Sequence, residues 1–346
     1  MSGIIHERPG VYSAYDASAV IPGGSGGKVV GLAAKAEKGT GPVLVTSYAA
    51  GVGAFGQGGA MAAMLRLLFL NGVTAVRAVA VQDEDYAGAF AQLALEEDVQ
   101  VVACDSGALA VQQSLRESLE NAAAARRERI GVVGCEESGK EALIARAAAL
   151  NCERMVLVGP GALDSDGEPV EGPIAAAAVA GAIAASADPA VPINGTPLHG
   201  LYGLEERYDD NAIDLLVRGG VTPLESVAGV VSPVRGITTR TKTGGAADST
   251  WRELTTILIV DDVIPAVRAA LRSRFSRSKN TAQNRGAIRS QVIVELENKL
   301  AAEIIDSYGD VAVSVDPEDP TVCLVEFSFG VAHGLNQIYL TAHITV

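Results

Sequence analysis

Short apolar runs alternate with helix-length segments through the middle of the chain. Strands are predicted at Val29–Ala34, Ala75–Val81, Val99–Cys104, Ile130–Gly134 and Met155–Gly159. Helices are predicted at Met61–Leu70, Leu109–Arg126, Lys140–Leu150 and Ile174–Ala187. The alternation of strand and helix predicts a parallel sheet covered by helices. Continuous apolar strands are typical of a sheet that is buried on both faces.

A second pattern follows a loop-rich, proline-containing region at residues 188–245, and we place a domain boundary at residue 246. Beyond it we expect a strand at Leu254–Val260, helices at Val263–Phe275 and Ala287–Ala302, and strands at Val311–Val315, Val322–Phe329 and Leu335–Val346. The predicted fold is an α/β central domain with a parallel sheet, an α+β carboxyl-terminal domain and extended terminal arms. The ranges are 1–28, 29–245 (divisible into 29–90 and 91–245), 246–334 and 335–346.

The two terminal segments have the pattern of extended arms. The amino-terminal arm residues are Pro9, Gly10, Val11 and Tyr12, and the Gly-rich run that follows includes Gly23, Gly24, Gly26 and Gly27. Because glycine tolerates large φ/ψ changes, this run is a predicted hinge. The carboxyl-terminal arm has apolar residues at even positions and polar groups at odd ones: Ile338, Tyr339, Leu340, Ala342, Ile344 and Val346. This period is that of a half-buried strand, which can pair with its own sheet or with an edge in another subunit.

Composition narrows the class of protein. The chain has 346 residues and a formal net charge of -14, which disfavours nucleic acid and anionic membranes as partners. Apolar residues make up 48% but aromatic residues only 4%, so the core must be built from Ala, Val, Leu and Ile. The first residues contain no secretory signal, and no apolar run is long enough to insert directly into a membrane. Cys104, Cys135, Cys152 and Cys323 form no CxxC pair and are interpreted as reduced core residues.

The candidate chemical motifs are weak. Gly134–Lys140 has the spacing of a phosphate-binding loop between a predicted strand and helix. However, Glu141 stands where a hydroxyl should hold magnesium, and Glu136 and Glu137 would repel phosphate. Gly23–Gly27 matches the G-x-S-x-G nucleophile motif without a strand before it, and the four histidines show no metal-binding spacing. The pair Asp261–Asp262 is interpreted as the amino end of a helix. We therefore predict no enzyme activity, catalytic residue, metal site or cofactor.

One charge feature stands apart from the acidic chain. Seven basic residues and no Asp or Glu lie between Ala266 and Ser290: Arg268, Arg272, Arg274, Arg277, Lys279, Arg285 and Arg289. A solvated helix followed by a basic loop would explain this pattern. An electrostatic contact with an acidic protein surface would explain it equally well.

Four segments, in order, resemble phage tail sheath proteins. They are Glu7–Tyr12, Trp251–Val263, the region of Asn280 before a long helix, and Ile338–Val346. The resemblance implies a structural subunit that stacks as hexameric rings around an inner tail tube and contracts to drive the tube through a target envelope. It also implies that both arms add strands to neighbouring subunits, and that the basic segment contacts the tube or an adjacent subunit.

Further expectations follow from the same resemblance. The partners would be copies of the chain itself, the inner tube protein, and baseplate and terminator proteins. The chain would be made in the host cytoplasm and reside in a phage tail or a phage-tail-like particle. Two alternatives stay open: a cytosolic α/β enzyme with a degenerate nucleotide-binding loop, and a shell or baseplate component that forms closed rings.

Overall fold

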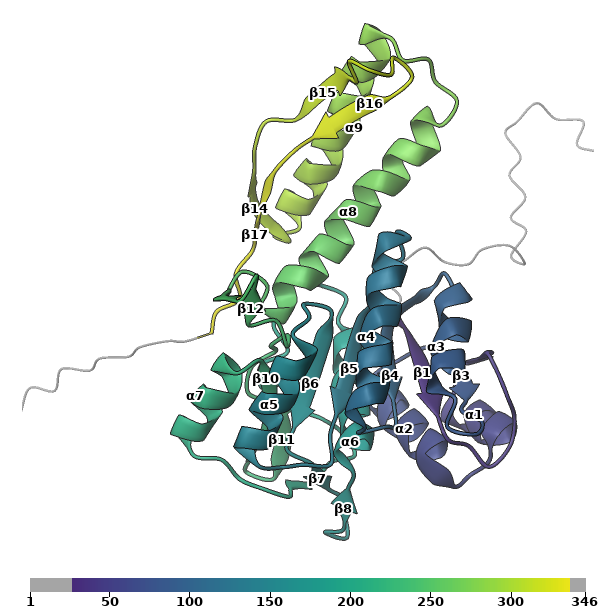
Figure 1. Ribbon diagram of the computed structural model, residues 1–346, viewed down its shortest axis with the longest axis vertical. Coiled ribbons are helices and arrows are strands. Elements are labelled where there is room, and N and C mark those ends of the chain that lie inside the picture. The colour runs from purple at the N-terminus through teal and green to yellow at the C-terminus, as the bar shows by residue number, and fades with distance from the viewer. Residues whose placement is uncertain (1–26, 337–346) are drawn as a thin grey trace, which may run out of the picture.

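The computed structural model describes residues 27–336, which form a broad α/β body and a narrower lobe (Figure 1). The body is built on one eight-stranded sheet, and the lobe consists of two helices and four short strands. The predicted arm residues, Pro9–Tyr12 and Ile338–Val346, and three of the hinge glycines, Gly23, Gly24 and Gly26, lie outside the described residues.

The sheet has the strand order β11-β10-β6-β5-β4-β1-β3-β2. Its strands are β1 (Val29–Ala34), β2 (Val43–Val45), β3 (Val76–Ala80), β4 (Val99–Cys104), β5 (Ile130–Gly134), β6 (Met155–Gly159), β10 (Val221–Val227) and β11 (Val230–Pro233). The six strands from β10 to β3 run parallel, while β2 and β11 are antiparallel at the two edges. The predicted parallel sheet is therefore confirmed at its centre, and the complete sheet is mixed.

Helices cover both faces of the sheet. One face packs against α1 (Tyr48–Phe55), α2 (Gly59–Leu70) and α6 (Gly172–Ala185). The other packs against α3 (Tyr86–Leu95), α4 (Leu109–Ala124), α5 (Lys140–Leu150) and α7 (Asp210–Arg218). Two small sheets complete the body: β7 (Ala162–Leu163), β8 (Pro169–Val170) and β9 (Gly203–Leu204) form one, and β12 (Lys242–Thr243) and β13 (Ala246–Ala247) form the other.

Helix α6 is the centre of the first core, and it is made almost entirely of small residues. Residues 172–184 of α6 are buried apart from Ile174, which is partly buried. Short side chains let the helix approach its neighbours closely: a Cβ at Gly134 of β5 would lie 2.1 Å from the carbonyl oxygen of Gly172. Such contacts explain how a core with few aromatic residues is filled.

The lobe contains α8 (Leu254–Phe275), α9 (Ala282–Ala301), β14 (Ile305–Tyr308), β15 (Ala312–Val315), β16 (Cys323–Glu326) and β17 (Phe329–Val331). Helix α8 connects the lobe to the body, because it contributes to two separate cores. Leu254, Ile257 and Leu258 pack in the core of the body, whereas Val263 and Val267 pack with α9 and the strands. The predicted domain limits stay predictions.

Several sequence expectations require correction. Leu254–Val260 is the first part of α8 and not a strand, so Asp261 and Asp262 lie inside a 22-residue helix and not at its amino end. The region 188–245, expected to be loop, supplies α7 and two strands of the large sheet. The predicted strand Val322–Phe329 is divided between β16 and β17, and Leu335 and Asn336 are not in a strand.

Candidate assembly surfaces

The lobe carries a two-stranded antiparallel ribbon, which consists of residues 305–315 and 323–331. Ile305 pairs with Val331, and Val315 pairs with Cys323 at the other end. Between the two paired stretches the amide of Gly309 donates to the carbonyl oxygen of Ser328 at 2.9 Å. Neither outer edge of the ribbon pairs with another strand among the described residues. Two strands alone are marginally stable in water, so open edges of this kind are suited to accepting further strands.

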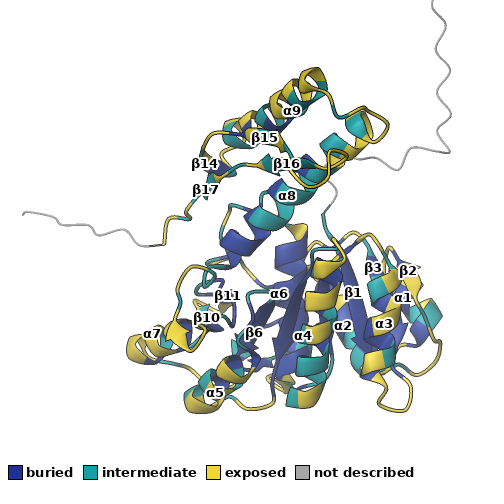
Figure 2. Ribbon diagram, turned by 45° about the horizontal axis from the view of Figure 1, so that its top comes forward, coloured by how far each residue is buried: buried dark blue, intermediate teal, exposed yellow. Residues whose placement is uncertain are grey.

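The ribbon is only half covered by its own chain. One face packs on α9 through side chains that include Val313, Val325 and Phe329. On the other face Leu324 is 38% exposed, and Ile305 and Val311 are the only residues of the ribbon that are buried. Figure 2 shows the contrast with the body, whose central strands and α6 are largely buried. The lobe therefore presents apolar surface and unpaired backbone groups together.

The basic segment spans the second half of α8, the turn that follows and the first half of α9, and the turn lies at the end of the lobe farthest from the body (Figure 1). Four of its seven basic side chains bind other residues of the chain. Arg268 pairs with Glu128 of the body at 2.7 Å, and the Arg289 Nε donates to the carbonyl oxygen of Val311 at 2.7 Å. Arg274 hydrogen-bonds Gln291, and Arg285 donates to Asn280 at 3.0 Å. Within residues 27–336, Arg272, Arg277 and Lys279 make no ion pair, and all three are exposed.

A buried ion pair fixes α8 to the body. The Arg154 guanidinium, at the start of β6, donates to both carboxylate oxygens of Asp261 at 2.7 and 2.9 Å. Both side chains are nearly inaccessible, with 11% and 14% exposed. Burial raises the pKa of Asp261, although the hydrogen bond and charge of Arg154 act in the opposite direction. The next residue, Asp262, contacts Lys299 of α9, so adjacent carboxylates join α8 to the body and to the lobe.

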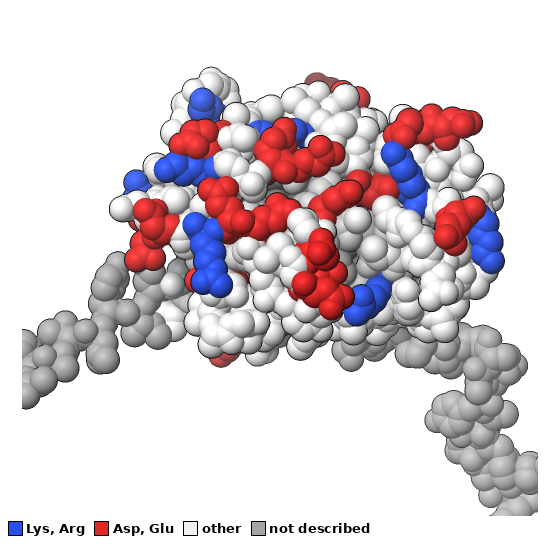
Figure 3. Space-filling model, turned by 90° about the horizontal axis from the view of Figure 1, so that it is seen from below, with Lys and Arg blue, Asp and Glu red and all other residues white. Residues whose placement is uncertain are grey.

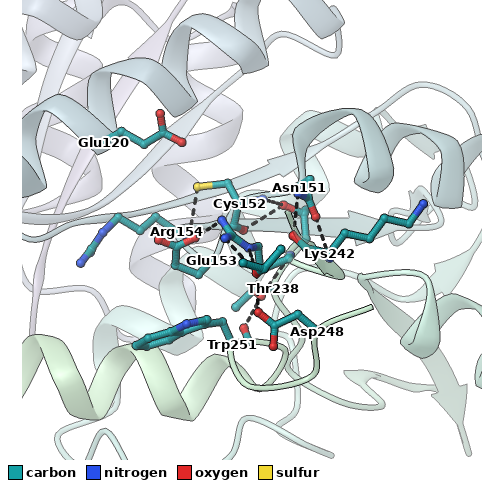
Figure 4. Close-up of polar contacts among 12 residues, drawn as sticks. Glu120, Asn151, Cys152, Glu153, Arg154, Thr238, Lys242, Asp248 and Trp251 are labelled. Carbon is teal, nitrogen blue, oxygen red and sulfur yellow. Dashed lines mark hydrogen bonds and ion pairs between the residues drawn. The ribbon is translucent and has the colours of Figure 1, made fainter. Parts of the chain in front are cut away.

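The segment that leads into α8 is also tied to the start of β6 (Figure 4). The Asn151 side chain accepts from the amides of Thr241 and Lys242 at 3.1 Å, and donates to the carbonyl oxygen of Lys242. The Thr238 hydroxyl donates to the carbonyl oxygen of Trp251 at 2.6 Å. These polar contacts set the direction in which α8 leaves the body.

A second ion pair, Arg268–Glu128, lies farther along α8 and predicts an acid-sensitive junction. Burial alone would raise the pKa of Glu128, but the hydrogen bond and charge of Arg268 hold it below its ordinary value. A carboxylate with a depressed folded pKa stabilises the fold above its unfolded pKa of about 4.3, and this contribution is lost as pH falls through the folded value. We expect stability to fall more steeply below about pH 4 in the native chain than in a Glu128→Gln variant. Urea unfolding at several pH values measures this, and parallel pH profiles would contradict it.

Gly134–Lys140, the segment with the spacing of a phosphate-binding loop, is a strand-to-helix connection between β5 and α5. Glu137 accepts from Arg146 at 3.1 Å, and Lys140 is half-buried with its Nζ 3.8 Å from the Glu141 carboxylate. Acidic side chains gather on the underside of the body, where the carboxyl ends of the parallel strands lie (Figure 3). This is the edge at which open α/β sheets bind phosphate ligands, and the exposed residues Asp83, Glu84 and Glu136 give it the wrong sign for that purpose.

Three further structural findings concern metal binding, membrane-spanning helices and the cysteines. Among residues 27–336 there is no group of three His, Cys, Asp or Glu side chains placed to hold a metal ion. Within the same residues, no helix is both long and apolar enough to cross a bilayer. Cys104, Cys135 and Cys152 are buried free thiols, as expected, while Cys323 is half-buried in the ribbon.

Comparison with known proteins bears on the lobe most directly. Residues 246–345 match the family described as phage tail sheath C-terminal domain, and this range contains α8, α9 and the ribbon. A tail sheath protein of Bacillus phage SP01 is 29% identical over 253 residues, which are 71% of this chain. Over residues 246–345 the chain is therefore similar to the carboxyl-terminal domain of phage tail sheath proteins. It spans less than half of that relative's length, since the match covers 43% of it.

Solved sheath structures share the fold. The sheath tail protein of Desulfitobacterium hafniense superposes with a TM-score of 0.69 at 11% identity, over 93% of this chain and 100% of that one. The sheath tail protein of Listeria innocua gives 0.72 at 13% identity, over 89% and 92%. The helical sheath of the anti-feeding prophage in its contracted state gives 0.73 at 13% identity, over 98% and 99%.

Proposed function

We propose that the chain is the structural subunit of a contractile tail sheath. In this function it polymerises as stacked rings around an inner tube, and the polymer contracts to drive the tube through a target envelope. The observation that carries the proposal is that residues 246–345 match a sheath domain and contain a ribbon with two open strand edges. In this proposal the chain resides in a phage tail or a phage-tail-like particle, with an inner tube, baseplate and terminator proteins as partners.

In this proposal the two terminal arms link neighbouring subunits. Residues 9–12 and 338–346 add strands to ribbons of neighbouring subunits, and their backbone groups satisfy the N–H and C=O groups along the open edges. Gly23–Gly27 lets the amino-terminal arm change direction while the strand pairing is kept. The enzyme alternative finds less support, because the edge where a nucleotide would bind is acidic and Lys140 points to Glu141.

Sedimentation of the purified chain tests the proposal. We expect fast-sedimenting polymer in equilibrium with a 35.5 kDa subunit, above a critical concentration. A protein that remains monomeric at all concentrations, in the presence and absence of tube protein, would overturn the proposal. Discrete closed rings would instead favour the shell or baseplate alternative.

The basic tip of the lobe is proposed to contact the tube or an adjacent subunit. Three exposed basic side chains make neither an ion pair nor a side-chain hydrogen bond within residues 27–336. Reversing their charges, in the variant Arg272→Glu/Arg277→Glu/Lys279→Glu, is expected to reduce polymer formation or co-sedimentation with the tube at least about tenfold, equivalent to about 1.4 kcal/mol. The matched control reverses three exposed arginines of the body: Arg66→Glu/Arg207→Glu/Arg218→Glu. Equal assembly and tube binding by the two variants would show that the tip is an ordinary solvated surface.

A further inference from the structure

An apolar groove lies on the body where α2 and α6 end. It has a volume of about 490 Å³ and is bordered by the connection of residues 191–199. Leu70 and Val191 stand at its rim with 45% and 54% of their surfaces exposed. None of its lining residues is Asp, Glu, Lys or Arg. A groove of this composition favours an uncharged, apolar occupant.

The described chain begins beside this groove. Gly27 lies against the end of α6, where a Cβ would approach the carbonyl oxygen of Ala184 to 2.9 Å. The amide of Lys28 donates to the same oxygen at 2.8 Å, and its Nζ donates to the carbonyl oxygen of Ser186 at 2.9 Å. Ala185 and Ser186 also line the groove. The residues that precede Gly27 are therefore tethered at the rim of the groove.

We propose that Val20, Ile21 and Pro22 of the same chain occupy this groove. Residues 17–26 contain no charged side chain, and these three, preceded by Ala19, are their largest apolar side chains. The four residues Gly23–Gly26 can span at most about 14 Å, and a linker this short and flexible holds the tripeptide at an effective concentration in the millimolar range. The groove takes the apolar tripeptide, and the tether removes most of the entropic cost of docking.

The carboxyl-terminal segment is the competing occupant, because it leaves the body nearby. The Asn194 amide donates to the side-chain oxygen of Asn336 at 2.9 Å, and Gly334 packs on Pro192. Its sequence fits the groove less well, since Thr341 and His343 alternate with its apolar residues and would lose solvent contacts. Docking of Val20–Pro22 would make Gly23–Gly27 a closed loop and place the root of the amino-terminal arm at about residue 19, so the Gly23–Gly27 hinge proposed above would act only when the tripeptide leaves the groove. This inference rests on the groove and the tether and does not depend on the proposed function.

Cysteine cross-linking tests the proposal in the full chain. In a Cys323→Ser background, the pair Ile21→Cys/Leu70→Cys is treated with a short bismaleimide, using a mixture of nitrogen-15-labelled and unlabelled chains. We expect cross-linked peptides whose two halves carry the same label. The matched control is Ile21→Cys/Leu95→Cys, because Leu95 is 74% exposed on the opposite face of the sheet. Equal yields from the two pairs, no cross-link at Leu70→Cys, or mixed-label peptides would each overturn the proposal.

The rate of maleimide labelling is a second test of the same docking and needs no cross-link. Leu70→Cys is expected to react with maleimide at least about fivefold faster when Ile21→Asp is also present, because the charged residue leaves the apolar groove. The control, Ser25→Asp, should leave the rate unchanged. Equal rates in the Ile21→Asp chain and in the parent would contradict the docking whether or not the protein polymerises, so the result is distinguishable from a failure of the proposed function.

Discussion

Ending the chain after Asn336 is expected to abolish polymer formation while the fold of residues 27–336 is retained. The removed residues supply the strand that the proposed function adds to the open ribbon of a neighbouring subunit. Within residues 27–336 the body and the lobe have hydrophobic cores of their own, which the truncation leaves in place. Sedimentation should show only subunits, at concentrations where the full chain forms polymer, and circular dichroism should stay unchanged.

Paired substitutions separate strand addition from a general effect of truncation. Leu340→Asp/Ile344→Asp places charges on the apolar face of the predicted strand and should prevent assembly. Thr341→Asp/Thr345→Asp adds the same charge to the other face and should reduce assembly much less. If the truncated chain still polymerises, or if both double variants behave alike, the carboxyl-terminal segment is not an intersubunit strand.

The second large effect concerns the junction of body and lobe. Arg154→Met is expected to destabilise the protein by about 3–5 kcal/mol, because it leaves the buried Asp261 carboxylate without its partner. The double variant Arg154→Met/Asp261→Leu should recover most of this loss, because it removes both charges from the interior. The midpoint and slope of urea unfolding measure both changes.

An exposed ion pair of the same chain provides the control. Arg218 and Asp214 lie 3.9 Å apart on α7 with about three quarters of each side chain exposed (73% and 70%), so Arg218→Met should change stability by at most about 1 kcal/mol. A loss for Arg154→Met no larger than that for Arg218→Met would contradict the assigned role of the buried pair. A double variant as unstable as Arg154→Met would show that the cost comes from packing and not from the unpaired charge.

The sequence was most informative where a single local pattern decides the structure. The runs at Val29–Ala34, Val99–Cys104 and Ile130–Gly134 are strands over their full predicted ranges, because a continuous apolar run between turns and amphipathic helices has few other solutions. The edges of the sheet were missed for a local reason as well. Pro223 in β10 suggested a loop, but β10 pairs with β6 only as far as Pro223 and then turns to pair with β11, near the edge of the sheet where proline is tolerated.

Long-range pairing explains the remaining errors. The run Thr255–Val260 reads equally well as a strand or as a buried helix, and only its packing against two cores decides for α8. Asp261 lies 107 residues from Arg154, and Arg268 lies 140 residues from Glu128, so neither pair could be found by inspection of local sequence. The basic segment was recognised because its charges are close together in the sequence. Its contact with the body, Arg268–Glu128, was missed because the two residues are far apart in the sequence. The open edges of the ribbon follow from which strands pair, and sequence pattern alone does not specify pairing.

Electron microscopy of the purified full chain tests the central claim most directly. The account predicts hollow tubules of stacked rings, with the ribbon of each subunit completed by strands from neighbouring subunits in a reconstruction. Particles in which residues 305–315 and 323–331 keep both edges free, or a protein that forms no tubules at any concentration with or without the inner tube, would contradict it.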